Sequence, residues 1–245
     1  MKLILLGTSG YHPSDRRHTP CLLIPQCGVV LDAGTGMYRL GKFLQTDEVD
    51  IFLTHAHLDH VIGLTYLFSV TWVHALKQVR VHGQAEKLKA IEEHLFFEDL
   101  SVRPPFESLP LEEVTLLKQG GRLTHFPLVH IGGALGFRLD WPGHSMAYVT
   151  DTTASADADY VEKIRGVDLL VHECYFPDEY ADLAVKYGHS CLTAVAEVAQ
   201  KAKVGRLILT HINPLIPADR PQDLSTARKV FPHIELGEDL MEVEF

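Results

Sequence analysis

Three histidines and one aspartate fall within six residues in the motif H-x-H-x-D-H at positions 55–60. An apolar run precedes the motif and apolar residues at helical spacing follow it, so we expect it where a strand turns into a helix. Residues two apart in an extended segment point to the same side, so His55 and His57 can reach one ion together. Asp59 and His60 then lie at the turn and the first helical residue and point elsewhere. This arrangement suits two metal ions side by side better than one.

Two ions need more ligands than this motif supplies, and three further candidates each end an apolar, strand-like run. A carboxylate has two oxygens to share, so Asp151 is the residue that we expect to bridge both ions. Imidazole and carboxylate together favour zinc, with manganese or iron as alternatives. We predict that His55, His57 and His130 bind one ion and that Asp59, His60 and His211 bind the other.

The composition excludes some classes of protein. The 245 residues carry a formal net charge of −10, which argues against a docking surface for long nucleic acid. The four cysteines form no C-x-x-C pair, as expected of reduced thiols in a cytoplasmic protein. The opening "MKLILLGTSG" resembles a first strand rather than a signal segment, and no apolar stretch has the length of a membrane span. We therefore predict a cytoplasmic protein.

Short β-branched or Leu-rich runs alternate with amphipathic stretches along the whole chain. This pattern predicts a mixed α/β (α+β) fold in which two sheets pack face to face with helices outside, an αββα sandwich formed as a single domain over residues 1–245. The passage Ser101–Pro110 is the one linker-like segment. The runs "DIFLTH", "RLTHFPLVH", "MAYVTD" and "RLILTH" each end in histidine or aspartate, so we expect strand ends to deliver the ligands to one edge. The predicted helices are Met37–Leu44, His60–Val70, Ala85–Phe97, Asp159–Arg165, Asp178–Tyr187, Leu192–Lys203 and Asp223–Val230.

The H-x-H-x-D-H motif, followed by spaced His, Asp and His, resembles the metallo-β-lactamase superfamily. The segments "LLGTSGYHP", "VVLDAGTG", "HECYF" and "GHSCLTAVAEVAQKAKVGRLILTHINP" resemble its ribonuclease Z branch and the shorter phosphodiesterase relatives of that branch. The resemblance covers nearly the whole chain and implies an αββα fold with a two-metal site at the edge of the sheets. It also implies that His189 in "YGHSC" is no ligand but faces the scissile phosphate and assists the departing oxygen.

The resemblance implies hydrolysis of a phosphodiester by a hydroxide between the two ions. Asp59 would orient this nucleophile and accept its proton, and His189 would act as general acid. Two carboxylates could support the site. Asp32 either bonds a ligand histidine or only shapes a turn, and Glu173 either holds the His189 loop or is an ordinary surface or capping carboxylate.

One departure bears on the substrate. The tRNA-gripping arm of ribonuclease Z is inserted between the positions of His130 and Asp151, which here are only 21 residues apart. We therefore expect a small phosphodiester, such as a cyclic nucleotide or a nucleotide-type diester, rather than long RNA or a membrane as partner. The alternatives are ribonuclease Z-like processing of RNA 3′ ends and a carbonyl hydrolase (lactonase or thioesterase) of the same superfamily. By family analogy a homodimer is among the expected states.

Overall fold

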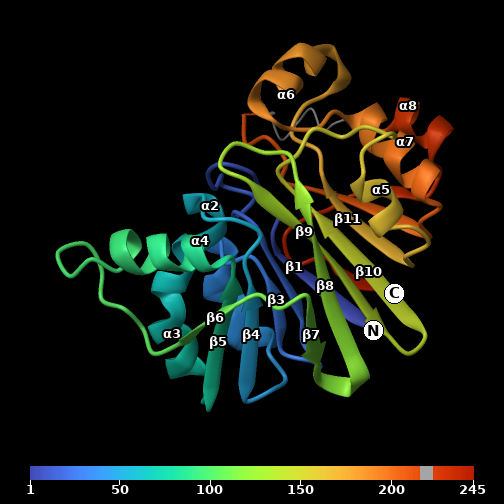
Figure 1. The fold of residues 1–245 in the computed structure, drawn as a ribbon. Coiled ribbons are helices and arrows are strands. Elements are labelled where there is room, and N and C mark those ends of the chain that lie inside the picture. Colours follow the sequence, from blue (N-terminus) through green and yellow to red (C-terminus); the bar gives the residue numbers. More distant parts are fainter. Residues whose placement is uncertain (216–222) are drawn as a thin grey trace.

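Two β-sheets pack face to face at the centre of the protein, and helices cover both outer faces (Figure 1). The computed structural model describes residues 1–215 and 223–245. The predicted αββα sandwich is thereby confirmed, and each sheet has seven strands within these residues. In spatial order the first sheet comprises β14 (Glu242–Glu244), β1 (Lys2–Gly7), β2 (Cys21–Ile24), β3 (Val29–Leu31), β4 (Glu48–Phe52), β5 (Gln78–Gly83) and β6 (Glu107–Pro110). The second comprises β13 (Ile234–Leu236), β12 (Arg206–Thr210), β11 (Leu169–Glu173), β10 (His144–Val149), β9 (Ala134–Trp141), β8 (Gly121–Leu128) and β7 (Val114–Leu117).

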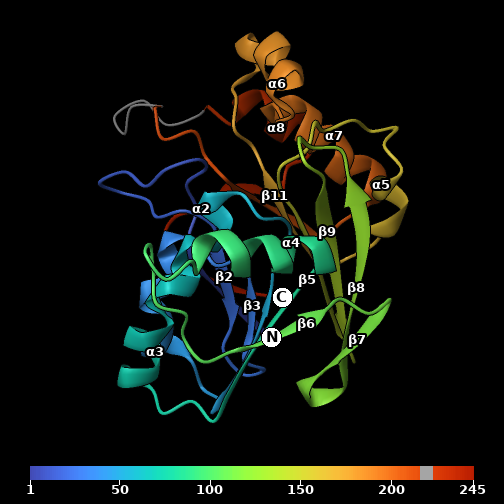
Figure 2. The same ribbon diagram turned by 60° about the vertical axis from the view of Figure 1, so that its left-hand side comes forward.

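The helices form the outer layers of the sandwich. Helices α2, α3 and α4 lie over the first sheet and α5, α7 and α8 over the second, whereas α6 projects beyond the sheets at the top of Figures 1 and 2. No helix among the described residues is long and apolar enough to cross a membrane. The α-helices are α1 (Leu40–Phe43), α2 (Leu58–Val61), α3 (Leu67–Val73), α4 (Ala85–Ala90), α5 (Tyr160–Lys163), α6 (Ala181–Tyr187), α7 (Leu192–Ala202) and α8 (Ser225–Val230).

The alternation of side chains along each strand divides the apolar residues among three layers. In β1, Leu3 and Leu5 point into the layer between the sheets, where they join Phe137 and Tyr148 of the other sheet. Ile4 and Leu6 point the other way and join the core beneath the helices of the first sheet. Both faces of the strand are therefore buried, which explains why "KLILLG" is an uninterrupted apolar run.

Some predicted elements differ from the structure. The linker-like passage Ser101–Pro110 ends in β6, which pairs in parallel with β5. The stretch predicted as one helix at His60–Val70 is instead α2, a 3-10 segment (Ile62–Tyr66) and α3, and the backbone of Val61 at the first junction departs from helical angles (φ −130°, ψ −17°). Strands β13 and β14, of three residues each, were not predicted.

The strand directions bring the carboxyl ends of many strands to one edge of the sandwich. In the first sheet β3, β4, β5 and β6 are parallel, and β1 runs the same way because two antiparallel pairings separate it from β3. In the second sheet β10, β11 and β12 are parallel, and β8 shares their direction for the same reason. In open α/β sheets this edge is where ligands bind.

Near the carboxyl terminus Asp239 ties together segments from the other end of the chain. Its Oδ1 accepts hydrogen bonds from the backbone N–H (3.0 Å) and hydroxyl (2.8 Å) of Thr8. Its Oδ2 accepts from the N–H of His18 (2.8 Å) and pairs with the Arg39 guanidinium (2.6 Å). The carboxylate is nearly buried, so its loss would leave a charge and two N–H groups without partners.

We expect Asp239→Ala to lower the free energy of unfolding by about 2–4 kcal/mol, because one partner of a buried ion pair is removed. The measurement is urea unfolding of metal-free protein. Glu242→Ala is the matched control: it removes the partner of Lys2 in a largely exposed ion pair, which should matter little. Equal losses in the two variants would contradict a special role for Asp239.

Candidate metal centre

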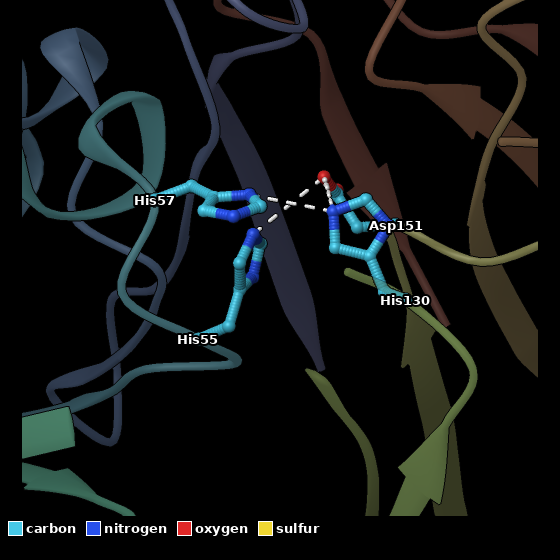
Figure 3. Close-up of side chains that lie close together, drawn as sticks. All are labelled: His55, His57, His130 and Asp151. Carbon is cyan, nitrogen blue, oxygen red and sulfur yellow. Dashed lines mark hydrogen bonds and ion pairs between the residues drawn. The ribbon is translucent and has the colours of Figure 1, made fainter. Parts of the chain in front are cut away.

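The seven predicted ligands converge on one place at the edge of the sandwich. Ligand atoms from His55, His57, His130 and Asp151 form one group in which all lie within 4.8 Å of one another, and Asp59, His60 and His211 form a second group by the same measure. Figure 3 shows the first group, with the three imidazoles and the carboxylate pointing toward one another. His55 follows β4, His130 follows β8, Asp151 follows β10 and His211 follows β12, so strand ends supply four of the seven.

Distances within the first group are alike. His130 Nε2 lies 3.3 Å from His57 Nδ1 and 3.4 Å from Asp151 Oδ2. His55 Nε2 lies 3.6 Å from the same carboxylate oxygen. Tetrahedral zinc with ligand bonds of about 2.0–2.1 Å would separate neighbouring ligand atoms by about 3.3 Å. The group therefore has the dimensions of a cation site.

The second group has the same dimensions. His60 Nε2 lies 3.3 Å from His211 Nε2, and Asp59 Oδ2 lies 3.4 Å from both nitrogens. The other oxygen of Asp151, Oδ1, lies 3.3 Å from His60 and 3.2 Å from His211. Asp151 thus turns one oxygen toward each group, which is the arrangement that a carboxylate bridging two cations requires.

Unpartnered atoms provide a further test of whether a cation fits. His55 is buried and its Nε2 has no hydrogen-bond partner among the described residues. A buried polar atom without a partner is unfavourable in a folded protein. A cation between His55 and Asp151 would satisfy this nitrogen, so the residues present fit a divalent metal.

The charges of the site lead to the same conclusion. Burial by itself would lower the pKa of His60, but Asp151, Asp59 and Asp32 raise it well above its usual value. Burial and the neighbouring imidazole of His60 instead lower the pKa of His55, which therefore stays neutral. Burial opposes ionisation of Asp151 and Asp59 too, yet the facing histidines hold both pKa values low. Three carboxylates thus demand positive charge, which one protonated imidazole supplies only in part.

The backbone at three of these strand ends is strained. Asp32, Asp151 and His211 have φ of 57°, 54° and 54°, in the left-handed region that residues other than glycine rarely adopt. Such strain persists where the surrounding structure over-determines it, and it clusters at functional sites. All three residues lie within two positions of the end of a strand that has a parallel neighbour, β3, β10 or β12.

Hydrogen bonds fix the orientation of the histidine rings. The Asp32 carboxylate accepts from His60 Nδ1 (2.8 Å), so Asp32 does more than shape a turn. The Thr54 hydroxyl lies 3.0 Å from His55 Nδ1, and the Gly188 carbonyl lies 3.1 Å from His130 Nδ1. In metal sites these partners set which nitrogen faces the cation. Sequence reasoning did not identify Thr54 or Gly188, because only the folded chain brings Gly188 to His130.

His189 lies beside both groups without belonging to either of the predicted ligand sets. Its Nδ1 is 3.2 Å from Glu173 Oε1, and the other Glu173 oxygen accepts from the N–H of Ser190 at 3.2 Å. Glu173 is completely buried at the end of β11, so it is neither a surface nor a capping carboxylate and it holds the His189 loop. Burial lowers the pKa of His189, but the charge and hydrogen bond of Glu173 outweigh this effect and raise it.

The loop after β1 does not offer its backbone N–H groups to a ligand. Those of Ser9 and Gly10 donate to the carbonyls of His18 and Ile212, and that of Thr8 donates to Asp239. Gly10 is needed instead for space, because a Cβ there would lie 2.5 Å from the His211 ring. One residue later, the Tyr11 N–H donates to Asp59 Oδ2 at 2.9 Å, a contact that the sequence did not predict.

Comparisons with known proteins agree with this geometry. The sequence model of the family described as the beta-lactamase superfamily domain matches residues 28–212, most of the chain. The chain belongs to the metallo-β-lactamase superfamily. A ribonuclease Z of Archaeoglobus fulgidus is 27% identical over 301 aligned positions, covering 99% of this chain and 97% of the relative. The predicted ribonuclease Z-like branch is confirmed, and the protein is a metal-dependent hydrolase.

Two solved structures share the fold of this superfamily member. The metallo-beta-lactamase fold protein YhfI from Bacillus subtilis has a TM-score of 0.80 at 18% identity, over 99% of each chain. A diphosphatase from the PhnP family has a TM-score of 0.72 at 21% identity, over 100% of this chain and 97% of the other. At these identities the likeness establishes the fold alone.

We expect Asp32→Asn to weaken zinc affinity about 10- to 100-fold, because the carboxylate accepts from His60 Nδ1 on Oδ2 and from the Thr54 N–H on Oδ1, whereas an amide has one accepting oxygen and no charge. Asparagine also tolerates the left-handed backbone at this position, so the fold should survive. The measurement is competition with a chelating dye. Asp50→Asn is the matched control, since Asp50 also lies 2.8 Å from a histidine nitrogen, that of His82, but far from the ligand set. Unchanged affinity in Asp32→Asn would contradict the proposed support of His60.

Proposed function

We propose that the protein is a dinuclear phosphodiesterase that acts on small phosphodiesters. The observation that carries the proposal is the Glu173–His189 pair, which places an imidazole beside the two predicted ligand sets. A ring nitrogen of His189 also lies within 4.8 Å of ligand atoms of Asp151 and His211, and we assign it to substrate rather than to a cation because Glu173 engages Nδ1. An imidazole in this place can assist an alkoxide that leaves phosphorus. The carbonyl hydrolases of this superfamily do not need such a group.

The two groups of residues would each hold one divalent cation, bridged by Asp151. Zinc fits this imidazole and carboxylate set best, with manganese or iron as alternatives. When bound, the cations act as Lewis acids, lowering the pKa of water and neutralising charge on the phosphoryl oxygens. The predicted ligands remain His55, His57, Asp59, His60, His130, Asp151 and His211.

Asp59 would handle the proton of the attacking water. Its Oδ2 faces His60 and His211 and accepts the N–H of Tyr11, which fixes the carboxylate. No hydrogen bond engages Oδ1 among the described residues, so this oxygen can orient a water and accept its proton. The low pKa of Asp59, set by the facing histidines against the effect of burial, keeps the carboxylate ionised.

His189 would serve the other end of the reaction. With Nδ1 held by Glu173, the other ring nitrogen, Nε2, is the one left to meet substrate. As the oxygen of water bonds to phosphorus, the bond from phosphorus to the leaving oxygen breaks with its electron pair. That oxygen takes a proton from His189 Nε2, and the proton of the water goes to Asp59. General acid help of this kind contributes about 10²- to 10⁴-fold to the rate.

The size of the substrate is inferred from the connection between His130 and Asp151. Strands β9 and β10 and short turns occupy all of this connection, so no segment is left for an RNA-gripping arm. The alignment to the A. fulgidus ribonuclease Z extends over 301 positions against 245 residues here, so that relative has segments that this chain lacks. The formal net charge of −10 also disfavours a polyanion as long as tRNA.

A second candidate is processing of RNA 3′ ends. The similarity to a protein named ribonuclease Z extends over nearly the full length of both chains, which favours RNA chemistry. The diphosphatase of the PhnP family shares the fold at 21% identity and does not decide between the two candidates. The two candidates share the centre and differ in how the rest of the substrate is held, so a direct comparison of substrates separates them.

We expect two divalent ions per chain by elemental analysis after equilibration with zinc or manganese, and loss of diester hydrolysis after chelation. Turnover of bis(p-nitrophenyl) phosphate should exceed that of a lactone, a thioester and nitrocefin by orders of magnitude, because the proposed centre acts on phosphodiesters rather than on carbonyl compounds. A cyclic nucleotide or dinucleotide should be hydrolysed with a higher kcat/KM than a precursor tRNA. Preferred cleavage of the tRNA would overturn the small-substrate proposal, and a preferred lactone or thioester would overturn the phosphodiesterase proposal.

We expect His189→Ala to retain both ions but to lose about 10²- to 10⁴-fold in kcat on diesters with basic leaving groups. Esters of p-nitrophenol, whose anion leaves without a proton, should be affected much less. The measurement is kcat for a series of esters that differ only in the leaving group. An equal loss across the series, or normal turnover throughout, would contradict the acid role.

A further inference from the structure

Tyr175 packs against the proposed acid and has no role in the function described so far. Its ring lies 4.6 Å from the His189 ring, centroid to centroid, with the planes only 19° apart, so the two are stacked. The Tyr175 centroid is also 5.7 Å from that of His211, and His189 and His211 are 5.3 Å apart. The three rings form a compact triangle at the edge of the metal centre.

The remaining contacts of Tyr175 show that the ring is held in place. The Phe176 ring meets it edge-on, with centroids 4.9 Å apart. On the loop after β1, a Cβ at Gly10 would lie 2.9 Å from Tyr175 Cδ2, so the tyrosine ring rests directly on the backbone of this glycine. The Tyr175 hydroxyl has no hydrogen-bond partner among the described residues, and burial raises its pKa to about 12. The face of the ring, rather than its hydroxyl, therefore makes the specific contact.

The stack supplies a restraint that the Glu173 contact cannot. One hydrogen bond, at 3.2 Å, fixes the position of His189 Nδ1 but leaves the imidazole able to pivot about that atom. A ring stacked on one face prevents the pivot and so sets the direction of Nε2, the nitrogen that would meet the leaving oxygen. Aromatic pairs in such geometry contribute beyond their buried area. His189 is partly exposed, so solvent-facing rotamers are otherwise open to it.

We propose that Tyr175 is a positioning residue that holds the plane of His189 for proton donation to the leaving oxygen. This inference rests on the proposed phosphodiesterase function.

The test compares Tyr175→Ala with Tyr175→Phe on two esters of one nucleotide, a phenyl ester and a p-nitrophenyl ester. We expect Tyr175→Ala to lower kcat on the phenyl ester about 10- to 100-fold, because misplacement of a catalytic group by about 1 Å costs this much. The p-nitrophenyl ester should change by less than about threefold, since its leaving anion needs little help. Tyr175→Phe keeps the stack and should match the unchanged protein on both esters.

Two further measurements make the outcome decisive. Zinc content must be retained in Tyr175→Ala, because loss of metal would indicate that the ring only supports His211 and would overturn the inference. The double variant Tyr175→Ala with His189→Ala should be no slower than His189→Ala alone, since the two residues act through one proton. Additive losses, or equal losses on both esters, would overturn the positioning role. Failure of the proposed function would give a different result. In that case the loss of kcat in His189→Ala would be the same for every leaving group.

Discussion

The arrangement of the site depends on the burial of negative charge at the edge where the two sheets meet. Asp32, Asp59 and Asp151 lie within hydrogen-bonding or ion-pairing distance of His60, and two of the three are almost completely buried. Carboxylates so placed are tolerated only when cationic groups or metals compensate them. Divalent cations would provide this compensation, and the 3.2–3.6 Å spacings between candidate ligand atoms leave room for them. The raised pKa of His60 and the fit of the site to cations therefore both follow from this buried negative charge.

That requirement also accounts for the backbone strain. Each left-handed residue at the edge, Asp32, Asp151 and His211, would be more stable as glycine on conformational grounds. Glycine has no side chain to contribute, however, so the chain adopts an unfavourable φ to aim a carboxylate or an imidazole. The left-handed backbone is tolerated because each of these turns follows a buried strand whose hydrogen bonds to its neighbours fix the position of the turn. Strain at this edge is thus balanced by the apolar layers beneath it.

The sequence predicted some parts of the site better than others, for physical reasons. The H-x-H-x-D-H motif is local, so its geometry follows from strand and helix periodicity alone. His130, Asp151 and His211 were predictable because strand ends in a two-sheet sandwich meet at one edge. Gly10, Tyr11 and Tyr175 act through contacts between distant segments, which no spacing in the chain encodes. The same holds for Asp239, whose three partner residues, Thr8, His18 and Arg39, lie 200 residues or more away in the sequence. Very short strands such as β13 and β14 escaped prediction because they depend on pairing, not on their own pattern.

His60 and His189 share one arrangement, a buried carboxylate bound to Nδ1, but they are suited to different roles. In each, a buried carboxylate engages Nδ1 and leaves Nε2 to act, Asp32 for His60 and Glu173 for His189. His60 is completely buried, and its Nε2 lies among Asp59, Asp151 and His211, where a cation would take the place of a proton. His189 is partly exposed and only borders that cluster, so its Nε2 can keep a proton and offer it to substrate. In both histidines the carboxylate engages Nδ1 and so leaves Nε2 free. The surroundings of Nε2 then determine whether the histidine suits the role of a metal ligand or that of an acid. The stacked Tyr175 acts on the surroundings of His189 Nε2, because it determines where this nitrogen points.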